Sequence, residues 1–447
     1  MRDFLPADVR RREYVIGVVR EVYERYGFEP LETPAVENIE TLLGKYGEEG
    51  NQLIFKILKR GEHEKTGAAD LALRYDLTVP LARVVAEYGD KLPKFFKRYQ
   101  IQPVWRADRP ARGRFREFYQ CDVDICGSRS MIVETELCSA VSDVLMRLGF
   151  NDFTIRLNHR QVLEKILAVA GVEPHQYADA LTALDKLDKI GYEGIMKEFE
   201  MRGIYLGAGE HLLNLFSSIE KRVAESDELQ SWNEYALEEI KSAMGHEAQS
   251  DQSLEELQRI LDYSAETSAK GKIRFTPNLA RGLSYYTGAI MEINVPDLAG
   301  SLGGGGRYDN LVGMFSGRDI PACGFSLGLE RIIVVMTERE MFPKELTSAP
   351  ADVMVTIWDE AATADALALA RELRAAGLRV DVYPQADKLG KQFKYASTIG
   401  VPFVAIAGPD ERARGEAALK DMRSGEQRTM RRTVVAATLQ ESLKRIV

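Results

Sequence analysis

The stretch between residues 105 and 127, WRADRPARGRFREFYQCDVDICG, constrains the fold more than any other part of the sequence. After the turn-prone RPARG, side chains alternate with the period of two that a β-strand imposes. One strand face carries Arg114, Arg116, Phe118, Gln120, Asp122 and Asp124. The opposite face, which can pack on a core, carries Phe115, Glu117, Tyr119, Cys121, Val123 and Ile125. The pattern predicts a β-strand after the turn, with one polar face and one face that packs on a core.

The polar face of this strand has two interpretations. Arginines, an aromatic ring and carboxylates on one face suit a polyanionic ligand with a nucleobase, because guanidinium groups bind phosphate and a ring stacks on a base. The alternative is the solvated face of an ordinary antiparallel strand. The surrounding residues 91–116 carry nine Lys and Arg against one acid, Asp108, interleaved with aromatic side chains. Taken alone, this stretch leaves both interpretations open.

The rest of the chain separates into regions of different periodicity. Its 447 residues are too many for one core, so two or three domains are expected. Residues 8–26 have helical spacing, residues 161–269 are charged and helical throughout, and strand character returns after them. LGGGGRYD is interpreted as a glycine-rich turn and MFPKELTSAP as a linker. The sequence predicts a core over residues 1–340, a helical insertion over residues 161–270 and a small α/β domain over residues 348–447.

Composition and charge exclude several classes of protein. Hydrophobic residues make up 45% and charged residues 28%, as in globular proteins. The charged N-terminus lacks a signal-peptide pattern and no apolar run of about 18 residues occurs, so we expect a cytoplasmic protein with no membrane partner. The four cysteines lack metal-ligand spacing, and we expect no metal site built from protein ligands. The net charge of -9 argues against a surface that is covered with basic residues for binding nucleic acid.

Several short peptides resemble those of one enzyme family. The stretch 106–127 resembles motif 2 of class II aminoacyl-tRNA synthetases, an antiparallel strand–turn–strand unit that binds ATP. GLERI resembles motif 3, and YGFEPLETPAVE, with Pro34, resembles the dimer-forming motif 1. ARGLSYYTG and GGGGRYDNLV resemble the two signature peptides of histidyl-tRNA synthetases and stand in the family's order. LRYDLTVPLAR resembles the family's amino-acid-site segment. The resemblance covers nearly the whole chain, except the helical insertion.

This resemblance implies a fold and an activity. The expected fold is an α+β catalytic core built on an antiparallel sheet, with the helical insertion, followed by a C-terminal α/β anticodon-binding domain. The expected enzyme is a homodimeric ligase that uses ATP and Mg²⁺ to activate L-histidine as an adenylate and then transfers histidine to tRNA(His). Such a reaction requires charge neutralisation along an in-line path rather than an acid or a base.

The resemblance also implies roles for individual residues. At the nucleotide, Arg106 would hold the α-phosphate, Arg114 the ATP tail and Phe118 the adenine ring, with Arg331 on the other side of the nucleotide. Arg281 would contact the α-phosphate and the histidine carboxylate, which makes Arg281 and Arg106 the expected catalytic residues. The histidine site would consist of Asp76, Thr78 and Gln120 around the α-amino group and Asp124 and Tyr286 at the imidazole ring, with Tyr285 as a further histidine-binding residue.

Simpler interpretations exist for several of these residues. Asp76 and Thr78 could cap a helix that begins near Val79. Tyr285 and Tyr286 could be strand packing, and Arg281 could lie in a surface turn. The Gly303–Gly306 run fits no phosphate-loop pattern, and close backbone approach beneath a substrate explains it better.

The sequence departs from the family at one place and leaves two rival functions. The signature peptide has Ser284 where the family usually has aspartate, which could alter the positioning of Arg281. One rival is an inactive paralogue that serves as a regulatory subunit of histidine biosynthesis, and the other is a class II synthetase for another amino acid. In the C-terminal region, Lys388, Lys391 and Lys394 at helical spacing are candidate tRNA phosphate contacts, or a solvated helix face.

Overall fold

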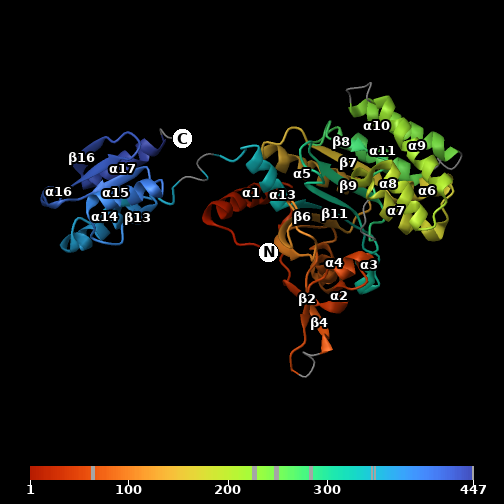
Figure 1. The fold of residues 1–447 in the computed structure, drawn as a ribbon, viewed down its shortest axis with the longest axis horizontal. Coiled ribbons are helices and arrows are strands. Elements are labelled where there is room, and N and C mark those ends of the chain that lie inside the picture. The colour runs from red at the N-terminus through yellow and green to blue at the C-terminus, as the bar shows by residue number, and fades with distance from the viewer. Residues whose placement is uncertain are drawn as a thin grey trace. The chain divides into compact units, whose positions relative to one another are not determined.

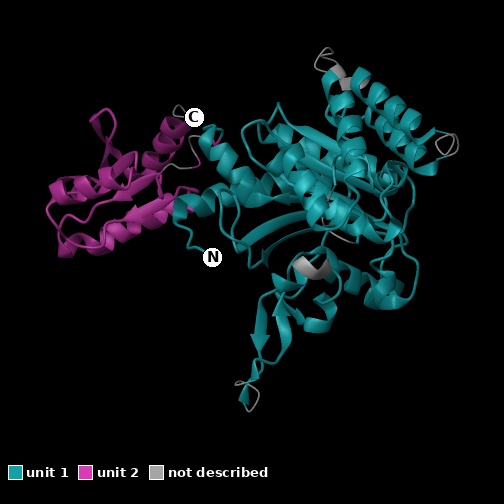
Figure 2. Ribbon diagram, turned by 45° about the vertical axis from the view of Figure 1, so that its right-hand side comes forward, with its two compact units in different colours: residues 1–341 teal, residues 342–447 magenta. Residues whose placement is uncertain are grey.

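The computed structural model describes the whole chain except residues 62–65, 224–228, 246–250, 281–284, 344–345, 347–348 and 445–447, and the side chains of residues 47–49, 222–223 and 229–230. The chain divides into two compact units, residues 1–341 and residues 342–447 (Figure 2). Each unit has its own β-sheet and its own buried core. Among the described residues, no helix is both long and apolar enough to span a membrane.

The first unit is built on an eight-stranded sheet with the order β1-β5-β6-β11-β10-β9-β7-β8. All neighbouring strands are antiparallel except the pairs β1–β5 and β7–β8. The strands are β1 (Glu29–Pro30), β5 (Phe96–Trp105), β6 (Glu117–Cys126), β7 (Thr154–His159), β8 (Ile273–Phe275), β9 (Ala289–Asn294), β10 (Gly303–Arg307) and β11 (Ala322–Gly328). The predicted antiparallel strand–turn–strand unit is therefore present as β5 and β6.

Three helices cover one face of this sheet. They are α1 (Pro6–Arg25), α5 (Ile132–Arg147) and α13 (Leu329–Glu338), which pack on one another and on β5, β6 and β11 (Figure 1). Helix α1 presents Val15, Val19 and Val22 to the core and stops before Gly27, whose φ of 75° ends the helix. Because these helices occupy one face, the polar side chains of β6 are left on the other face of the sheet.

The helical region predicted from the sequence is present between β7 and β8. It consists of α6 (Arg160–Ala170), α7 (Tyr177–Leu184), α8 (Leu187–Met201), α9 (Leu206–Val223), α10 (Leu229–Met244) and α11 (Gln252–Ser264). These helices pack mainly on each other, while α10 contacts β8 and α11 contacts α5 (Figure 1). The insertion is thus attached at the edge of the main sheet.

A small three-stranded sheet with the order β2-β4-β3 projects from the first unit (Figure 2). Its strands are β2 (Val36–Asn38), β3 (Lys56–Leu58) and β4 (Ala69–Leu73). The short helices α2 (Ile39–Leu42) and α3 (Gly47–Gln52) connect them, α4 (Thr78–Tyr88) follows, and α12 (Gly313–Ser316) packs on α4. Val36, Leu58 and Leu71 on this small sheet are exposed.

The second unit is an α/β domain with a five-stranded sheet of order β13-β12-β14-β15-β16. Strands β13 (Val380–Val382), β12 (Val353–Val355) and β14 (Phe403–Ile406) are parallel, the arrangement typical of an α/β domain. Strands β15 (Glu416–Asp421) and β16 (Gln427–Arg431) add an antiparallel edge that the sequence analysis did not predict. Its helices are α14 (Thr363–Ala375), α15 (Leu389–Thr398), α16 (Pro409–Arg414) and α17 (Arg432–Lys444). Buried residues line both faces of this sheet.

Candidate active site

A cavity of about 1110 Å³ lies against the sheet face that the helices α1, α5 and α13 leave open. Its wall includes the glycines of β10, the polar side chains of β6, the segment before α4 and the start of α13. Every candidate residue that the structure describes lines this cavity: Asp76, Thr78, Arg106, Arg114, Phe118, Gln120, Asp124, Tyr285, Tyr286 and Arg331. Arg281 and Ser284 lie outside the described residues. The fold thus brings together side chains from distant parts of the chain.

One part of the cavity is built around Arg106, which follows β5. Its Nε donates a hydrogen bond to the carbonyl oxygen of Tyr75 over 3.0 Å. Its guanidinium carbon lies 4.3 Å from the centre of the Tyr75 ring and 5.2 Å from that of Phe118. Stacking on two rings holds the planar cation while leaving its remaining N–H groups available to an anion.

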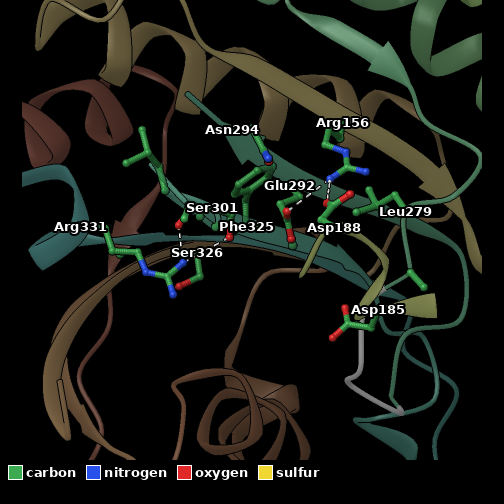
Figure 3. A pocket seen from close by; sticks show the side chains of 18 of the residues that line it. Arg156, Asp185, Asp188, Leu279, Glu292, Asn294, Ser301, Phe325, Ser326 and Arg331 are labelled. Carbon is green, nitrogen blue, oxygen red and sulfur yellow. Dashed lines mark hydrogen bonds and ion pairs between the residues drawn. The ribbon is translucent and has the colours of Figure 1, made fainter. Parts of the chain in front are cut away.

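The turn between β5 and β6 packs against the start of α13. Arg114 is half-exposed and lies 3.5 Å from Asp108 across the turn. Arg331 donates hydrogen bonds to the carbonyl and hydroxyl oxygens of Ser301 (Figure 3). A side chain at Gly113, whose φ is 68°, would approach Arg331 Cγ to 3.1 Å, so glycine permits this close packing.

Asp76 is buried and anchors a second part of the cavity. Its carboxylate accepts hydrogen bonds from the hydroxyls of Tyr46 (2.9 Å) and Tyr285 (3.4 Å) and from the backbone N–H of Val79 (3.1 Å). Leu77 is the N-cap residue of α4, which begins at Thr78, and Asp76, one residue earlier, satisfies the Val79 N–H in the first turn. Asp76 therefore supports the helix start as expected, although it is not the N-cap residue itself. The same carboxylate also lines the cavity, which means that capping and ligand contact do not exclude each other. Burial raises the pKa of Asp76 above its ordinary value.

Asp124 lies in the centre of β6 within a buried polar cluster. Arg98 of β5 is directly opposite Asp124 in the strand register, and Arg98 Nη2 lies 2.8 Å from Asp124 Oδ2. The hydroxyl of Tyr308, just after β10, donates a hydrogen bond to Asp124 Oδ1. A side chain at Gly324 of β11 would clash with this carboxylate, since its Cβ would lie 1.9 Å from Oδ1. Only glycine at that position leaves Asp124 room to face the cavity.

A second carboxylate, Asp122, lies two residues from Asp124 on the same face of β6. It is 1% exposed and its Oδ2 is 3.9 Å from Arg98 Nη2. Burial outweighs the attraction of Arg98 and raises the pKa of Asp122 to about 7. Burial raises the pKa of Asp124 as well. Gln120, one step further along the face, donates from Nε2 to Ser326 Oγ over 2.7 Å.

The glycine run of residues 303–306 is a strand, so its prediction as a turn was wrong. In β10 a Cβ at Gly305 would lie 2.0 Å from the carbonyl oxygen of Gly324, and one at Gly303 would lie 2.4 Å from that of Ser326. The glycines therefore let β10 and β11 approach closely, and they also line the cavity. The expected close approach of backbone beneath the cavity is present, within a sheet rather than a loop.

The cavity extends towards the helical insertion, and Figure 3 shows Arg156, Asp188 and Glu292 on this side of it. Arg156 of β7 pairs with Asp188 of α8 over 2.5 Å and lies 4.0 Å from Glu292 of β9. Near them the guanidinium carbon of Arg274 lies 3.6 Å from the ring centre of Trp232. Positively and negatively charged side chains of the insertion and of the sheet thus line the same part of the cavity.

Sequence reasoning missed several residues of this site. Arg98 and Tyr308 contact Asp124, and Tyr46 contacts Asp76. Asp122 lies next to Arg98. None of these four residues was selected from the sequence. Asp122 shares the alternating face with Asp124, which was a usable signal. Arg98 and Tyr308 reach Asp124 only through strand pairing between distant segments, which the pattern of a single strand does not reveal.

The described residues contain no cluster of three His, Cys, Asp or Glu side chains arranged to hold a metal ion. All four cysteines are buried and unbonded. Burial raises the pKa of Cys126 to about 12, so this thiol stays protonated at neutral pH. His159, for which the sequence suggested no role, accepts a hydrogen bond from the Gln161 N–H at the start of α6.

Comparison with known proteins gives a consistent result. The family model for histidyl-tRNA synthetase matches residues 1–332, and the model for an anticodon binding domain matches residues 352–442. Histidine--tRNA ligase from Porphyromonas gingivalis is 41% identical over 98% of both chains, and that from Gloeobacter violaceus is 41% identical over 95% of this chain and 94% of its own.

Solved structures agree with the sequence matches. The histidyl-tRNA synthetase from Nostoc sp. PCC 7120 superposes with a TM-score of 0.79 at 30% identity, over 99% of this chain and 97% of its own. The apo enzyme from S. aureus shares the fold with a TM-score of 0.65 at 20% identity. The predicted fold class is confirmed. Because sequence models, full-length relatives and fold all agree, the chain belongs to the histidyl-tRNA synthetase family.

Proposed function

We propose that the cavity carries out the two-step ligation of L-histidine to tRNA(His). In the first step the histidine carboxylate attacks the α-phosphorus of ATP, which forms histidyl-adenylate and releases pyrophosphate. In the second step a ribose hydroxyl at the 3′ end of the tRNA attacks the activated carbonyl, and AMP leaves. The observation that carries this proposal is the arrangement of cations and carboxylates along one cavity in a member of this family.

The nucleotide would occupy the part of the cavity lined by Arg106, Phe118, Arg114 and Arg331. Phe118 offers a ring for the adenine base, and Arg106 beside it would bind the α-phosphate. Arg114 and Arg331 would bind the ATP tail, because the turn that carries Arg114 packs directly on Arg331. Arg281, which lies outside the described residues, would complete the contact to the α-phosphate and the histidine carboxylate. Fixed positive charges of this kind stabilise the charge that develops on the phosphate.

Histidine would bind between Asp76 and Asp124. Asp76, with Thr78 and Gln120 near it, would accept hydrogen bonds from the α-ammonium group. Asp124 would accept from a ring N–H, and Tyr285 and Tyr286 would enclose the ring. A buried acceptor of this kind rejects analogues that lack the N–H group, because it is then left unpaired.

Mg²⁺ fits this cavity as an ion that arrives on the ATP phosphates. Such an ion keeps several waters and needs only one or two carboxylates from the protein. Glu330, next to Arg331, lines the cavity, and its buried Oε1 accepts no hydrogen bond among the described residues, although Arg12 Nη2 lies 3.5 Å from it. Glu330 would help to hold the ion, and the bound ion would neutralise phosphate charge.

The second unit would bind the anticodon of tRNA(His), as its family model implies. Lys388, Lys391 and Lys394 are exposed on α15 or at its start, with Tyr395 beside them. Lys391 already pairs with Asp387 over 3.0 Å, so Lys388 and Lys394 are the better candidates for phosphate contacts. We place the enzyme in the cytoplasm, where tRNA is charged.

The enzyme would act as a homodimer through the segment around Pro34. The exposed apolar side chains Val36, Leu58 and Leu71 on the adjoining small sheet support an interface there. Light scattering should give about twice the chain mass of 50.1 kDa. A mass of one chain at micromolar concentration would refute the dimer.

Pyrophosphate exchange with each amino acid in turn tests the proposed reaction. Exchange should depend on histidine, and tRNA(His) should then be charged. Exchange with another amino acid would favour the other class II synthetase, and exchange with none would favour the regulatory paralogue. The match of residues 352–442 to an anticodon-binding domain and the presence of Arg106, Arg114 and Arg331 in the cavity favour the ligase.

Replacing Arg281 by alanine should lower adenylate formation by about 10²–10³-fold with little change in folding, because a fixed charge at the α-phosphate is lost. Single-turnover adenylate formation and circular dichroism would measure both effects. Unchanged kinetics in the folded variant would refute this role.

A further inference from the structure

Two buried oxygen atoms on the cavity face of β6, Gln120 Oε1 and Asp122 Oδ1, have no hydrogen-bond donor within the described part of the chain. A third, Asp124 Oδ2, lies 2.8 Å from Arg98 Nη2 in an ion pair and accepts no hydrogen bond among the described residues. The three residues are at most 7% exposed, and all line the cavity. The only side-chain nitrogen in this row, Gln120 Nε2, already donates to Ser326. A ligand that completes this row must therefore donate hydrogen bonds and need not accept any.

The charges around this row also favour a ligand that donates hydrogen bonds, because negative charge exceeds positive charge there. Arg98 on β5 is fully buried beneath Asp122 and Asp124, and it does not line the cavity. The other titratable groups that act on the pair, among the described residues, are Cys121 and Cys126 on β6, Tyr23 on α1, Arg74 and Asp76 before α4, Tyr308 after β10 and Cys323 on β11. Arg74 donates its hydrogen bonds to oxygens of Thr33, Pro34, Gln102 and Pro103 instead of to this pair. When both carboxylates are ionised, Arg98, the cation that pairs with them, leaves one buried negative charge, which is unfavourable unless a further cation compensates it.

We propose, on the basis of the proposed function, that histidine is bound with its side chain as an imidazolium whose two N–H groups donate to Asp124 and Asp122. Asp122 is then a second specificity-determining residue. An imidazolium carries two donors and no acceptor, whereas a neutral imidazole would set its lone pair against a carboxylate oxygen. The added proton also cancels the excess negative charge of the cluster.

The proton balance makes this binding mode dependent on pH. Free histidine has a side-chain pKa of about 6.5, so above pH 7 most of it is neutral and must acquire one proton on binding. That proton comes from solvent or from Asp122, whose pKa is about 7. The KM for histidine should therefore rise by up to about tenfold for each pH unit between 7 and 8.5.

Nitrogen NMR of ring-labelled [¹⁵N₂]histidine bound to the full-length protein tests the charge state directly. At pH 8 both ring nitrogens should resonate as protonated N–H groups. A pyridine-type resonance from bound histidine at this pH would overturn the proposal. This experiment needs no variant, so it does not depend on the folding of one.

Kinetics of Asp122→Asn test the role of the second carboxylate. The variant should bind histidine at least tenfold more weakly at pH 7, with a KM for ATP within about twofold of wild type, and its KM for histidine should no longer rise with pH. Asp410→Asn, the same change at an exposed position of α16, should retain the wild-type pH dependence. If the wild-type enzyme activated histidine normally but its KM for histidine did not change with pH, only this inference would be overturned. Absence of histidine activation at every pH would instead remove the proposed function.

Discussion

At the scale of single residues, the candidate site depends on acidic groups in unusual surroundings. Asp122 is buried with incomplete compensation, and Asp76 is shared between a helix start and the cavity. Folding energy and ligand binding are therefore coupled at both residues, and substitutions can separate the two contributions.

Asp122 should lower the stability of the free protein at alkaline pH. Its folded pKa of about 7 lies above the ordinary value of 3.8, so the folded state binds an extra proton between these values. The stability that this proton contributes is lost as pH rises from about 4 to 7 and stays lost above 7. Asp122→Asn should therefore gain about 1–3 kcal/mol relative to wild type between pH 5 and pH 8. Urea unfolding at both pH values measures this difference, and an equal effect at the two values would contradict it.

Two substitutions of Asp76 should separate capping from binding. Asp76→Asn keeps an oxygen for the Val79 N–H, whereas Asp76→Ala removes it and should destabilise the protein by about 1 kcal/mol more. Both variants lose the negative charge proposed to face the α-ammonium group, so both should show a similar, large rise in KM for histidine. Urea midpoints and exchange kinetics provide the measurements. Normal histidine KM in Asp76→Asn would assign the residue to helix capping alone.

At the scale of elements, β10 shows how a run of glycines in a strand shapes the site. Gly303, Gly305 and Gly306 lie between β9 and β11, where the neighbouring backbones leave no space for a Cβ atom. Gly324 on β11 has the same function beside Asp124. Because these glycines have no side chains, they do not cover the carboxylates of β6, which remain accessible from the cavity.

Gly305→Ala should disrupt this part of the sheet. The new Cβ would lie 2.0 Å from the carbonyl oxygen of Gly324, so the strands must separate, and we expect a loss of at least about 2 kcal/mol in unfolding free energy. Gly17→Ala in α1 is the matched control. Nothing lies within 4 Å of its new Cβ, so alanine should be neutral or stabilise the helix by about 0.5–1 kcal/mol. Thermal unfolding of both variants tests this, and a tolerated Gly305→Ala would show that the strands can move apart at low cost.

At the scale of the whole molecule, the two units contain separate cores. The second unit buries both faces of its sheet under its own helices, and the candidate residues of the cavity all belong to the first unit. Adenylate chemistry and anticodon binding would therefore be divided between the units.

A fragment of residues 1–341 should retain histidine-dependent pyrophosphate exchange and lose most tRNA charging. Exchange requires only the cavity, whereas charging also requires the anticodon contacts proposed for the second unit. Exchange rates and charging rates of the fragment and the full chain measure the two functions. Equal loss of both in a folded fragment would show that the second unit also supports the cavity.

Much of this organisation follows from local patterns in the sequence. The period of two placed Gln120, Asp122 and Asp124 on one strand face, and helical spacing located α1 and the insertion, because these periodicities arise from backbone geometry within one element. The signature peptides indicated the family, and the family models confirm it. Ten candidate residues from the signature peptides, motifs 2 and 3 and the amino-acid-site segment line one cavity.

Only the tertiary structure determined which side chains lie next to these residues. The pairing of β5 with β6 puts Arg98 beneath Asp124, and the end of β10 brings Tyr308 to the same carboxylate. The glycine run became a strand rather than a turn because β9 and β11 enclose it on both sides. Register between distant segments sets such contacts, and it depends on how all the strands pack together rather than on any single stretch of sequence.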